Sequence, residues 1–282
     1  MNSKQPINSN RTSGKKKKLN PMFVIMILAL CAVVFTLLFV YFSVGFRYIT
    51  CDNGTKFLGK VKNEEPYKGS IYYTDGTKST LNTEEQTIVY ENGDIYVGEI
   101  KSLMRHGTGK MTYVNGNVYT GDFFNDQMTG KGVFEYSNGD RYEGDFLNGE
   151  RHGQGSYSWT DETGVSSYVG EFKNNLKDGE GVYTWGDGAK YEGAFVNNIK
   201  NGKGVYTFVN GDVYEGDFVD DRRTGYGKYT WANGDRYEGQ FENNTISGKG
   251  VYTWASGRKY EGYFKDNTIE IVDEQESSQE NS

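Results

Sequence analysis

Two patterns of apolar and polar residues divide the chain. Residues 22–46 (MFVIMILALCAVVFTLLFVYFSVGF) contain no charged side chain. At about 1.5 Å rise per residue, a helix of this length reaches roughly 37 Å, enough to cross a hydrocarbon core of about 30 Å with some tilt. From residue 88 onward, aromatic residues alternate with polar ones in short runs such as Tyr214-Glu215-Gly216-Asp217-Phe218. This alternation predicts half-buried β-strands.

The apolar segment is predicted to remain in the protein as one transmembrane helix, spanning residues 21–46. The competing interpretation is a cleaved signal peptide, whose apolar run is about 7–15 residues long and ends at small residues. Here the run is longer, and the sequence that follows, Gly45-Phe46-Arg47-Tyr48, is a poor cleavage site. The lipid bilayer is therefore the expected partner of residues 22–46.

Charge on the two sides of this segment predicts its orientation. Residues 1–20 hold 6 of the 31 basic residues and none of the 38 acids, so the remainder of the chain is strongly acidic. Lys/Arg-rich flanks stay cytoplasmic, which predicts a cell-membrane protein with a cytoplasmic N-terminus and a repeat domain on the non-cytoplasmic side. The lysines at 15–18 would also suit an anionic lipid surface, at about 1 kcal/mol each. The topology signal is sufficient to explain them.

The two cysteines are too few for a disulfide framework. Cys31 lies within the apolar segment and Cys51 just beyond it, so an intact helix keeps them apart. Cys51 is left with two interpretations, a free thiol and a disulfide between two copies in an oxidising compartment.

A Tyr-x-Gly-x-Phe motif, with close variants, recurs after the apolar segment. Its copies are 23 residues apart, except for one interval of 26 residues. Self-similarity at a fixed period predicts a repeat architecture. The structural repeat positions are Tyr96, Gly98, Tyr119, Gly121, Tyr142, Gly144, Tyr168, Gly170, Tyr191, Gly193, Tyr214, Gly216, Tyr237, Gly239, Tyr260 and Gly262.

Two further elements keep phase with this motif. Gly-x-Gly pairs stand at Gly107/Gly109, Gly130/Gly132, Gly153/Gly155, Gly179/Gly181, Gly202/Gly204, Gly225/Gly227 and Gly248/Gly250. Each pair leads into an aromatic stretch and, in most repeats, a turn dipeptide: Asn92-Gly93, Asn115-Gly116, Asn138-Gly139, Asp187-Gly188, Asn210-Gly211, Asn233-Gly234 or Ser256-Gly257. Such dipeptides between alternating runs are the strongest short-range hairpin signal. The unit is predicted to be a β-hairpin.

Alternation also assigns the faces of these strands. Tyr, Gly and Phe of the motif share one side, and the acids between them share the other. Glycine leaves room for a ring from the neighbouring strand to lie over the backbone. Because no single hairpin is stable in water, the repeats must share a continuous aromatic core, to which Tyr183, Trp185, Tyr206, Phe208, Tyr229, Trp231, Tyr252 and Trp254 contribute.

Two regions depart from the rhythm. Residues 160–167 are three residues longer than the equivalent turns, which predicts a protruding loop, either a tolerated insertion or a binding epitope. Residues 47–87 contain partial copies, with Asn53-Gly54 at a turn and Ser79 where a ring is expected. They are predicted to be degenerate repeats that cap the rod next to the membrane.

These motifs resemble the MORN repeat (membrane occupation and recognition nexus), over about residues 88–265. The resemblance implies an all-β fold, an elongated single-layer antiparallel β-meander of repeated hairpins, here preceded by one transmembrane α-helix. It divides the chain into a basic tail (1–20), a helix (21–46), a juxtamembrane region (47–87), about eight repeats (88–265) and an acidic disordered tail (266–282). Scaffolding, dimerising and phosphoinositide-binding roles belong to such repeats. An acidic rod on the non-cytoplasmic side does not suit anionic lipid.

The sequence predicts no catalytic, cofactor-binding or metal-binding residues. His106 and His152 occupy equivalent positions two repeats apart, too far for a joint metal site, and Gly-x-Gly lacks the strand-to-helix context of nucleotide binding. Acids recur at Glu143, Glu192, Glu215, Glu238 and Glu261, and a periodic arrangement favours a solvated stripe over one tuned pocket. Nucleic acid is disfavoured because phosphate binding needs a basic footprint.

The leading functional hypothesis is a non-catalytic, membrane-anchored scaffold. Its repeat sheet would bind an unknown protein partner or associate with itself, as in a homodimer. The alternative from another class is a surface glycan-binding or enzyme-accessory protein that uses exposed aromatics and acids. Binding of glycans along the ladder from Trp159 to Trp254 would favour the alternative.

Overall fold

The computed structural model describes residues 20–43 and 45–270, which form one helix and one 21-stranded sheet. Helix α1 spans Pro21–Ser43. The strands are β1 (Phe46–Thr50), β2 (Lys56–Lys62), β3 (Glu65–Tyr72), β4 (Lys78–Asn82), β5 (Thr87–Tyr90), β6 (Ile95–Lys101), β7 (Met104–Thr112), β8 (Val118–Phe124), β9 (Gln127–Glu135), β10 (Arg141–Leu147), β11 (Glu150–Asp161), β12 (Gly164–Lys173), β13 (Leu176–Thr184), β14 (Lys190–Val196), β15 (Ile199–Thr207), β16 (Val213–Val219), β17 (Arg222–Thr230), β18 (Arg236–Glu242), β19 (Thr245–Thr253), β20 (Lys259–Lys265) and β21 (Thr268–Glu270).

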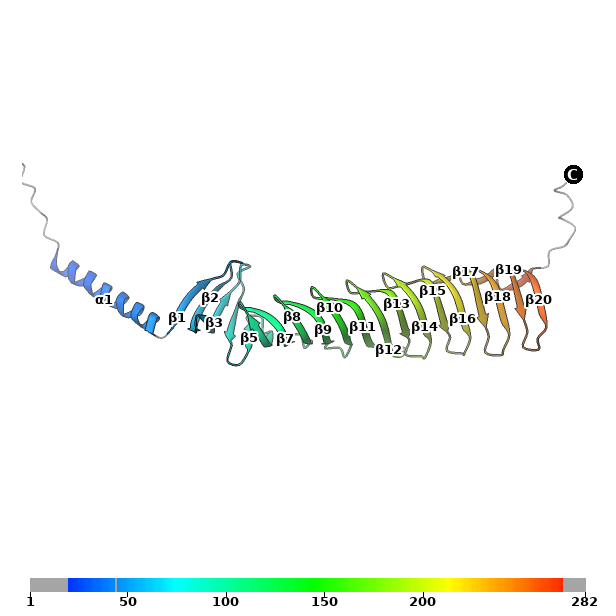
Figure 1. The fold of residues 1–282 in the computed structure, drawn as a ribbon, viewed down its shortest axis with the longest axis horizontal. Helices are drawn as coiled ribbons and strands as arrows, with labels where there is room; N and C mark the ends of the chain where they lie inside the picture. The colour runs from blue at the N-terminus through cyan, green and yellow to red at the C-terminus, as the bar shows by residue number, and fades with distance from the viewer. Residues whose placement is uncertain (1–19, 44, 271–282) are drawn as a thin grey trace, which may run out of the picture.

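Each strand pairs antiparallel with the next strand along the chain, from β1 to β21. The sheet is a single layer, and successive hairpins follow one another along a rod (Figure 1). The predicted all-β meander with one N-terminal apolar helix is confirmed.

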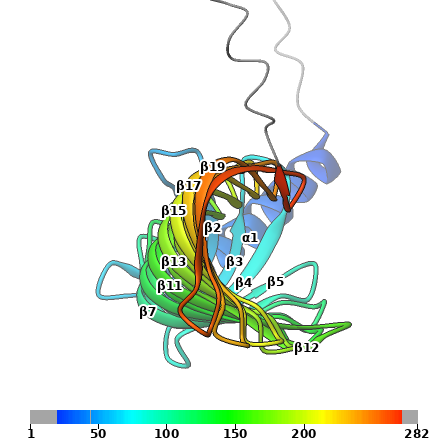
Figure 2. The same cartoon turned by 90° about the vertical axis from the view of Figure 1, so that its right-hand side faces the viewer.

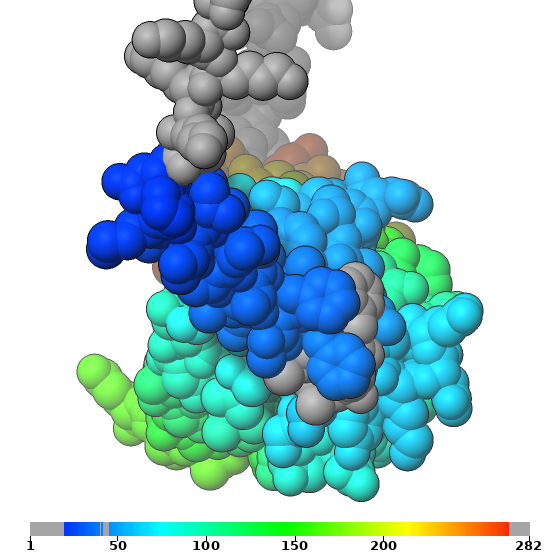
Figure 3. Space-filling view, turned by 90° about the vertical axis from the view of Figure 1, so that its left-hand side faces the viewer, coloured from blue at the N-terminus to red at the C-terminus, as the bar shows by residue number. Residues whose placement is uncertain are grey.

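The helix begins with two strong start signals. The side-chain oxygen of Asn20 accepts a hydrogen bond from the Met22 N–H at 3.0 Å, and Pro21 occupies the first helical position. The helix is three residues shorter than the predicted 21–46, because Gly45 takes φ +71° and Phe46 already pairs with Lys60 in the sheet. Figure 3 shows the helix standing in front of the sheet's end, and its side chains over residues 21–39 are exposed.

Two kinds of turn alternate along the rod. The Asn-Gly dipeptides lie in three-residue loops: in one of them the Gly116 N–H donates to the Tyr113 carbonyl, and Gly116 has φ +90°. The tighter connections are two-residue turns that the sequence analysis did not identify. Both of their central residues have positive φ, such as Asn197 (50°) and Asn198 (73°), as a type I′ turn requires.

The sheet curls toward its aromatic face, so its cross-section is an arc rather than a flat ribbon (Figure 2). Side chains six residues apart on one strand meet: Lys177 Nζ lies 4.5 Å from the Tyr183 ring centroid. Such residues are about 20 Å apart in a straight strand. The bend lies at the first glycine of each Gly-x-Gly, for example Gly179 with φ +112°. The concave side is hereafter the trough.

The three-residue insertion does not form a loop. It lengthens β11 and β12 instead, so that Asp161 pairs with Gly164 across a two-residue turn. This hairpin protrudes from the rod beside the label of β12 in Figure 2. Ser166 and Asp161 hold it in place, since Ser166 Oγ donates to Asp161 at 2.6 Å and accepts the Gly186 N–H at 3.0 Å.

The first rounds of the sheet keep the pairing but change the packing. Phe57 takes the tyrosine position, and its ring covers Gly59 and Gly69. In the next round Ser79 has no ring, and the glycine positions are occupied by Leu81 and Ile88, which are paired and fully buried. Leucine and isoleucine thus fill the space that the missing ring leaves.

At the other end, strand pairing continues past residue 265. Thr268–Glu270 pairs with β20, so the predicted start of the acidic tail at residue 266 lies inside the last hairpin. Most of the predicted basic tail (1–19) and the rest of the acidic tail (271–282) lie outside the described residues.

Candidate functional site

The repeat tyrosines form the floor of the trough. From Tyr96 to Tyr237 all seven are fully buried, and Tyr260 in the last strand pair is partly buried. Each buried ring lies over two glycines, one on its own strand and one on the next. A Cβ built on Gly204 would stand 2.5 Å from the Tyr191 ring, and a Cβ on Gly193 would stand 2.9 Å from the Tyr191 hydroxyl.

The tyrosine hydroxyl has a separate role at a β-bulge. Residue 194 is skipped in the pairing of β14 with β15, and the Tyr191 hydroxyl donates to its carbonyl at 3.0 Å. The extra residues of this bulge lie on β15, between Lys200 and Gly204, and they disrupt the ladder locally, so the hydroxyl supplies a bond beside the disruption. The same bond recurs from Tyr96, Tyr119, Tyr142, Tyr168, Tyr214 and Tyr237.

Phenylalanines link these tyrosines into one continuous ladder. Tyr and Phe rings alternate from Tyr96 to Tyr260 in edge-to-face contacts, such as Tyr191–Phe218 at 5.0 Å between centroids and Tyr214–Phe218 at 5.2 Å. Edge-to-face pairs contribute about 0.5–1.5 kcal/mol each beyond area burial. Burial also raises the pKa of Tyr214 to about 12, so these hydroxyls stay protonated at neutral pH.

A second row of rings forms one wall of the trough. Tyr183, Trp185, Tyr206 and Phe208 are half-buried and in contact, with centroids 4.2–5.3 Å apart. The row extends back through Trp159 and Tyr157 to Tyr113, and it continues forward to Trp254. This is the aromatic ladder that the sequence predicted.

Cations face these rings, a feature that the sequence analysis missed. The residue two positions before Gly-x-Gly points into the trough and is basic in five repeats: Arg105, Arg151, Lys177, Lys200 and Arg223. The equivalent residues in the other two repeats are Met128 and Ile246. In sequence these positions look like ordinary polar surface, and only the bend of the strand brings them over the rings.

Lys177 is a half-buried cation surrounded by rings. Its ammonium lies within 6 Å of four ring centroids, those of Trp159, Tyr168, Tyr183 and Phe195. No carboxylate bonds to it among the residues that the structure describes. Burial, followed by the repulsion of Lys200, lowers the pKa of Lys177 to about 8.

The second residue of each two-residue turn ties one repeat to the one before it. Asn198 Oδ1 accepts the Lys177 N–H at 2.8 Å, and the Asn198 N–H donates to the Lys177 carbonyl at 2.8 Å. Asp126, Asn175, Asp221, Asn244 and Asn267 do the same for their neighbours. Asn and Asp tolerate positive φ, and the recurrence of these pairs at 23 residues was a usable signal in the sequence.

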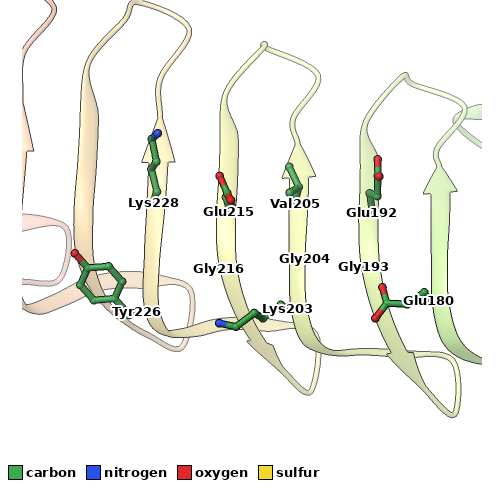
Figure 4. A pocket seen from close by; sticks show the side chains of 10 residues that line it. All are labelled: Glu180, Glu192, Gly193, Lys203, Gly204, Val205, Glu215, Gly216, Tyr226 and Lys228. Atoms are coloured by element: carbon green, nitrogen blue, oxygen red, sulfur yellow. The ribbon is translucent and has the colours of Figure 1, made fainter.

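The convex face carries the predicted acidic stripe. Glu192 and Glu215 are exposed, and Lys190 and Lys203 form ion pairs with Glu192 and Asp217 at 2.9 Å. Figure 4 shows Glu192, Lys203 and Glu215 beside an open hollow, whose volume is about 620 Å³. Its floor is Gly193, Gly204 and Gly216, and its rim mixes both charges, so it offers no single chemistry.

The histidines lie apart, on β7 and β11, four strands or about 19 Å from one another. Their Nδ1 atoms are buried without a hydrogen-bond partner among the described residues. Within residues 20–43 and 45–270 no three His, Cys, Asp or Glu side chains gather in a way that would hold a metal ion.

The chain is similar to known proteins in its repeat sheet. Solved structures similar to this chain include the TCP domain of Drosophila melanogaster SAS-4 in complex with a proline-rich motif of Ana2 (17% identity, 72% of this chain and 94% of that chain, TM-score 0.33). Another is the TCP10 domain of Danio rerio CPAP (13% identity, 79% and 100% coverage, TM-score 0.31). No curated protein matches the chain. The MORN repeat model matches residues 96–118, 119–141, 142–163, 168–190, 191–213, 214–236 and 237–257, more than half of the sequence, and the chain therefore belongs to the MORN repeat family.

Proposed function

We propose that the chain is a membrane-anchored, non-catalytic scaffold whose trough binds a protein partner. MORN repeats point to a repeat-based interaction role. The observation that carries the proposal is the continuous floor of buried rings beneath a wall of half-exposed rings, which together form one long binding surface. A periodic surface suits an extended partner, whereas catalysis needs one tuned environment.

The anchor in this proposal is α1. Residues 21–39 have a mean hydropathy of 3.0, and all of their described side chains are exposed. With the basic residues before it, the helix would hold the N-terminus in the cytoplasm and the rod outside. Alkaline carbonate extraction should leave the chain in the membrane pellet, and protease added to intact cells should remove the rod. Release of the chain by carbonate, or a protected rod, would contradict the anchor or its orientation.

The same proposal retains the division into a basic tail (1–20), an anchor (21–46), degenerate first rounds (47–87), a repeat rod (88–265) and an acidic tail (266–282). The tyrosines and glycines of the rod are proposed to be structural positions, with the cations and half-exposed rings above them making contact with the partner. Self-association as a homodimer is the second form of the same activity.

In-cell photocrosslinking tests the binding surface. A photoreactive phenylalanine in place of Trp185 lies in the trough wall, and one in place of Glu192 lies on the convex face. A protein adduct formed from position 185 and absent from position 192 supports the proposal. A glycan adduct from position 185 would favour the glycan-binding alternative, and an adduct from position 192 alone would move the interaction to the convex face.

A further inference from the structure

Charge is distributed unequally between the two faces of the sheet. Four consecutive repeats place a cation in the trough, at Arg151, Lys177, Lys200 and Arg223, and each lies within 6 Å of the ring six residues further along its own strand. On the convex face the recurring side chains are glutamates, as at Glu192, Glu215 and Glu238, all of them exposed. The inside of an acidic rod therefore carries a regular row of cations.

Three of these four cations form no ion pair among the described residues. Lys200 has Asp221 at 3.1 Å. Arg151 and Arg223 donate to the main-chain carbonyls of Asn175 and Asn244, which carry no charge. Lys177 faces rings, with Arg151 and Lys200 repelling its charge and Asp221 attracting it. The carboxylates of Asp140 and Asp212 accept hydrogen bonds from the wall tyrosines Tyr157 and Tyr229 at 2.7 Å rather than from the cations. The strip from Arg151 to Arg223 therefore holds three cations that form no ion pair among the described residues.

The surroundings of this strip specify an occupant that is both anionic and partly apolar. Desolvated cations gain most from a charged acceptor, because charge-assisted hydrogen bonds are about twice as strong as neutral ones. The rings beside them offer apolar contact. At Arg223 the trough encloses a hollow of about 240 Å³ lined by Tyr229, Trp231 and Phe241, with Asn244 on the opposite wall. A side chain of moderate size fits such a space.

The spacing of the cations selects the conformation of a polypeptide occupant. One cation appears every two strands, and at about 4.8 Å between strands this is roughly 9.6 Å. A polyproline II helix advances about 3.1 Å per residue and repeats every three residues, about 9.3 Å per turn. It presents every third side chain to the same side at nearly this spacing. A β-strand has a period of two, so the side chains of residues i and i+3 point to opposite faces and cannot both reach the cations.

Trp159 adds a reason to centre the site on Lys177. Trp159 lies near the end of β11, stacks on Tyr157 at 5.1 Å and contacts the Tyr183 ring edge-on at 5.3 Å. Its ring is 5.9 Å from Lys177 Nζ. Trp159 therefore continues the aromatic wall beside a cation that has no carboxylate partner among the described residues.

We infer that the trough between Arg151 and Arg223 binds an acidic segment of the partner protein in polyproline II conformation, with a carboxylate at every third residue. This inference rests on the proposed protein-binding function and names the chemistry of the partner. The carboxylates bind the cations in register with the repeats, and the residues between them pack on the Tyr and Trp wall.

A synthetic probe tests the inference on the full chain in detergent micelles. The probe is a fluorescein-labelled (Glu-Pro-Ala)4 peptide, compared with a peptide of the same composition whose glutamates are adjacent, and with (Lys-Pro-Ala)4. Fluorescence anisotropy should show binding of the first peptide. Clustering the glutamates should weaken binding about 10-fold, and the lysine peptide should not bind. Equal affinity for both acidic peptides would overturn the spacing, and failure of both to bind would overturn the inference.

Variants place the binding in the trough. Lys177→Gln should weaken binding about 10- to 100-fold, the range expected for loss of a charged hydrogen bond, and Lys177→Arg should restore most of it. Lys203→Gln is the matched control, because Lys203 lies two strands away on β15 but points to the convex face, with its side chain 85% exposed. Circular dichroism checks that both variants fold. Equal loss in Lys177→Gln and Lys203→Gln would refute a site in the trough.

Other anions separate this inference from the proposed function. Polygalacturonate oligosaccharide and vesicles of phosphatidylglycerol are offered to the same chain. If either binds more tightly than the peptide and loses affinity in Lys177→Gln, the polypeptide occupant is wrong. If position 185 captures a protein in cells while the acidic peptide does not bind, the proposed function stands and the acidic polyproline II partner is refuted.

Discussion

The tyrosine and the glycine of the Tyr-x-Gly motif each stabilise a strongly bent strand in a specific way. The tyrosine ring occupies space that two glycines leave open, and its hydroxyl bonds to a main-chain carbonyl beside the bulge. Phenylalanine at position 57 shows that the ring alone is sufficient in the first rounds. The hydroxyl and the ring can therefore be tested separately.

Tyr214→Phe should remove the hydrogen bond to the Asp217 carbonyl, 3.0 Å long, and keep the ring. We expect the free energy of unfolding to fall by about 1 kcal/mol, whereas Tyr214→Ala should cost about 3–5 kcal/mol because it leaves a cavity in the ladder. Urea unfolding followed by near-UV circular dichroism measures both. Tyr226→Phe, at a tyrosine that is 64% exposed, is the control and should change little. A Tyr214→Phe variant as stable as the parent would show that the hydroxyl bond beside the bulge does not stabilise the fold.

Gly204 and Gly188 are required for different physical reasons. A Cβ on Gly204 would meet the Tyr191 ring at 2.5 Å, while Gly188 has open space around it but φ +93°. Gly204→Ala should cost about 1–3 kcal/mol through overpacking, and Gly188→Ala about 1–2 kcal/mol through backbone strain. In a Tyr191→Leu background the first penalty should shrink and the second should not. If the stability cost of Gly204→Ala were the same in the parent and in the Tyr191→Leu background, the packing of rings over glycines would be contradicted.

Lys177 should lower the stability of the free protein at neutral pH. Its pKa is about 8 in the folded chain and 10.5 when exposed, so between these values the unfolded chain binds more protons and stability rises with pH. Lys177→Met should therefore stabilise the rod at pH 7, on the order of 1 kcal/mol after allowance for partial exposure, and this advantage should narrow by pH 9. Urea midpoints at both pH values measure it. Lys203→Met should show no such narrowing.

At the scale of the hairpin, two turn sequences alternate, and only one of them could be recognised in advance. The Asn-Gly loops were recognisable because the dipeptide alone is a turn signal. The Asn-Asn and Asp-Asp turns were not recognised, although their positive φ values and their bonds to the preceding repeat recur at each round. Their signal is a period in Asn and Asp rather than a glycine, and short polar residues are easily taken for ordinary loop.

Substitutions at Asn198 separate its two roles. Asn198→Asp should be nearly neutral, because Asp221 fills the equivalent position and accepts the Lys200 N–H at 3.1 Å. Asn198→Gly keeps the positive φ and loses the bond to Lys177, at about 1 kcal/mol. Asn198→Ala loses the bond and adds about 1–2 kcal/mol of strain. Hydrogen exchange at the Lys177 amide reports the tie directly. Protection that survives in Asn198→Gly would show that the bond is dispensable.

The insertion illustrates why local length is a poor guide to structure. Three extra residues predicted a loop, since loops accept length cheaply. In the structure they extend two paired strands, and the Ser166 and Asp161 side chains hold them against the neighbouring turn. The sequence showed where the rhythm broke but not that the extra residues could pair with one another.

For the whole molecule, the order of strands could be predicted and the curvature could not. The period, the turn dipeptides and the alternation define an antiparallel meander. The trough depends on a bend at every Gly-x-Gly and a bulge in every repeat, and neither is visible in an alternation pattern. Without the bend, Lys177 and Tyr183 would lie about 20 Å apart, so the row of cations inside an acidic rod could not be foreseen.

Because each repeat contacts only its neighbours, a whole repeat should be removable. Deletion of residues 191–213 joins Lys190 to Tyr214, which stands in the same phase as Tyr191, so β13 can pair with β16 in the register it now shares with β14. We expect a folded rod that is shorter by about 9.6 Å, two strand spacings. Deletion of residues 191–202 instead brings a Gly-x-Gly strand to the tyrosine position and should unfold the neighbouring hairpins.

Pulsed electron paramagnetic resonance on the full chain measures this length. Spin labels replace Lys110 and Lys228 on β7 and β17, with both native cysteines changed to serine. Ten strand spacings predict about 48 Å between the labels, falling to about 38 Å after the 23-residue deletion. An unchanged distance, or loss of the β-sheet signal, would show that stability is not passed from neighbour to neighbour. The deletion also brings Arg223 into the place of Lys200, so the spacing of cations survives and the acidic peptide should still bind, over a site one repeat shorter.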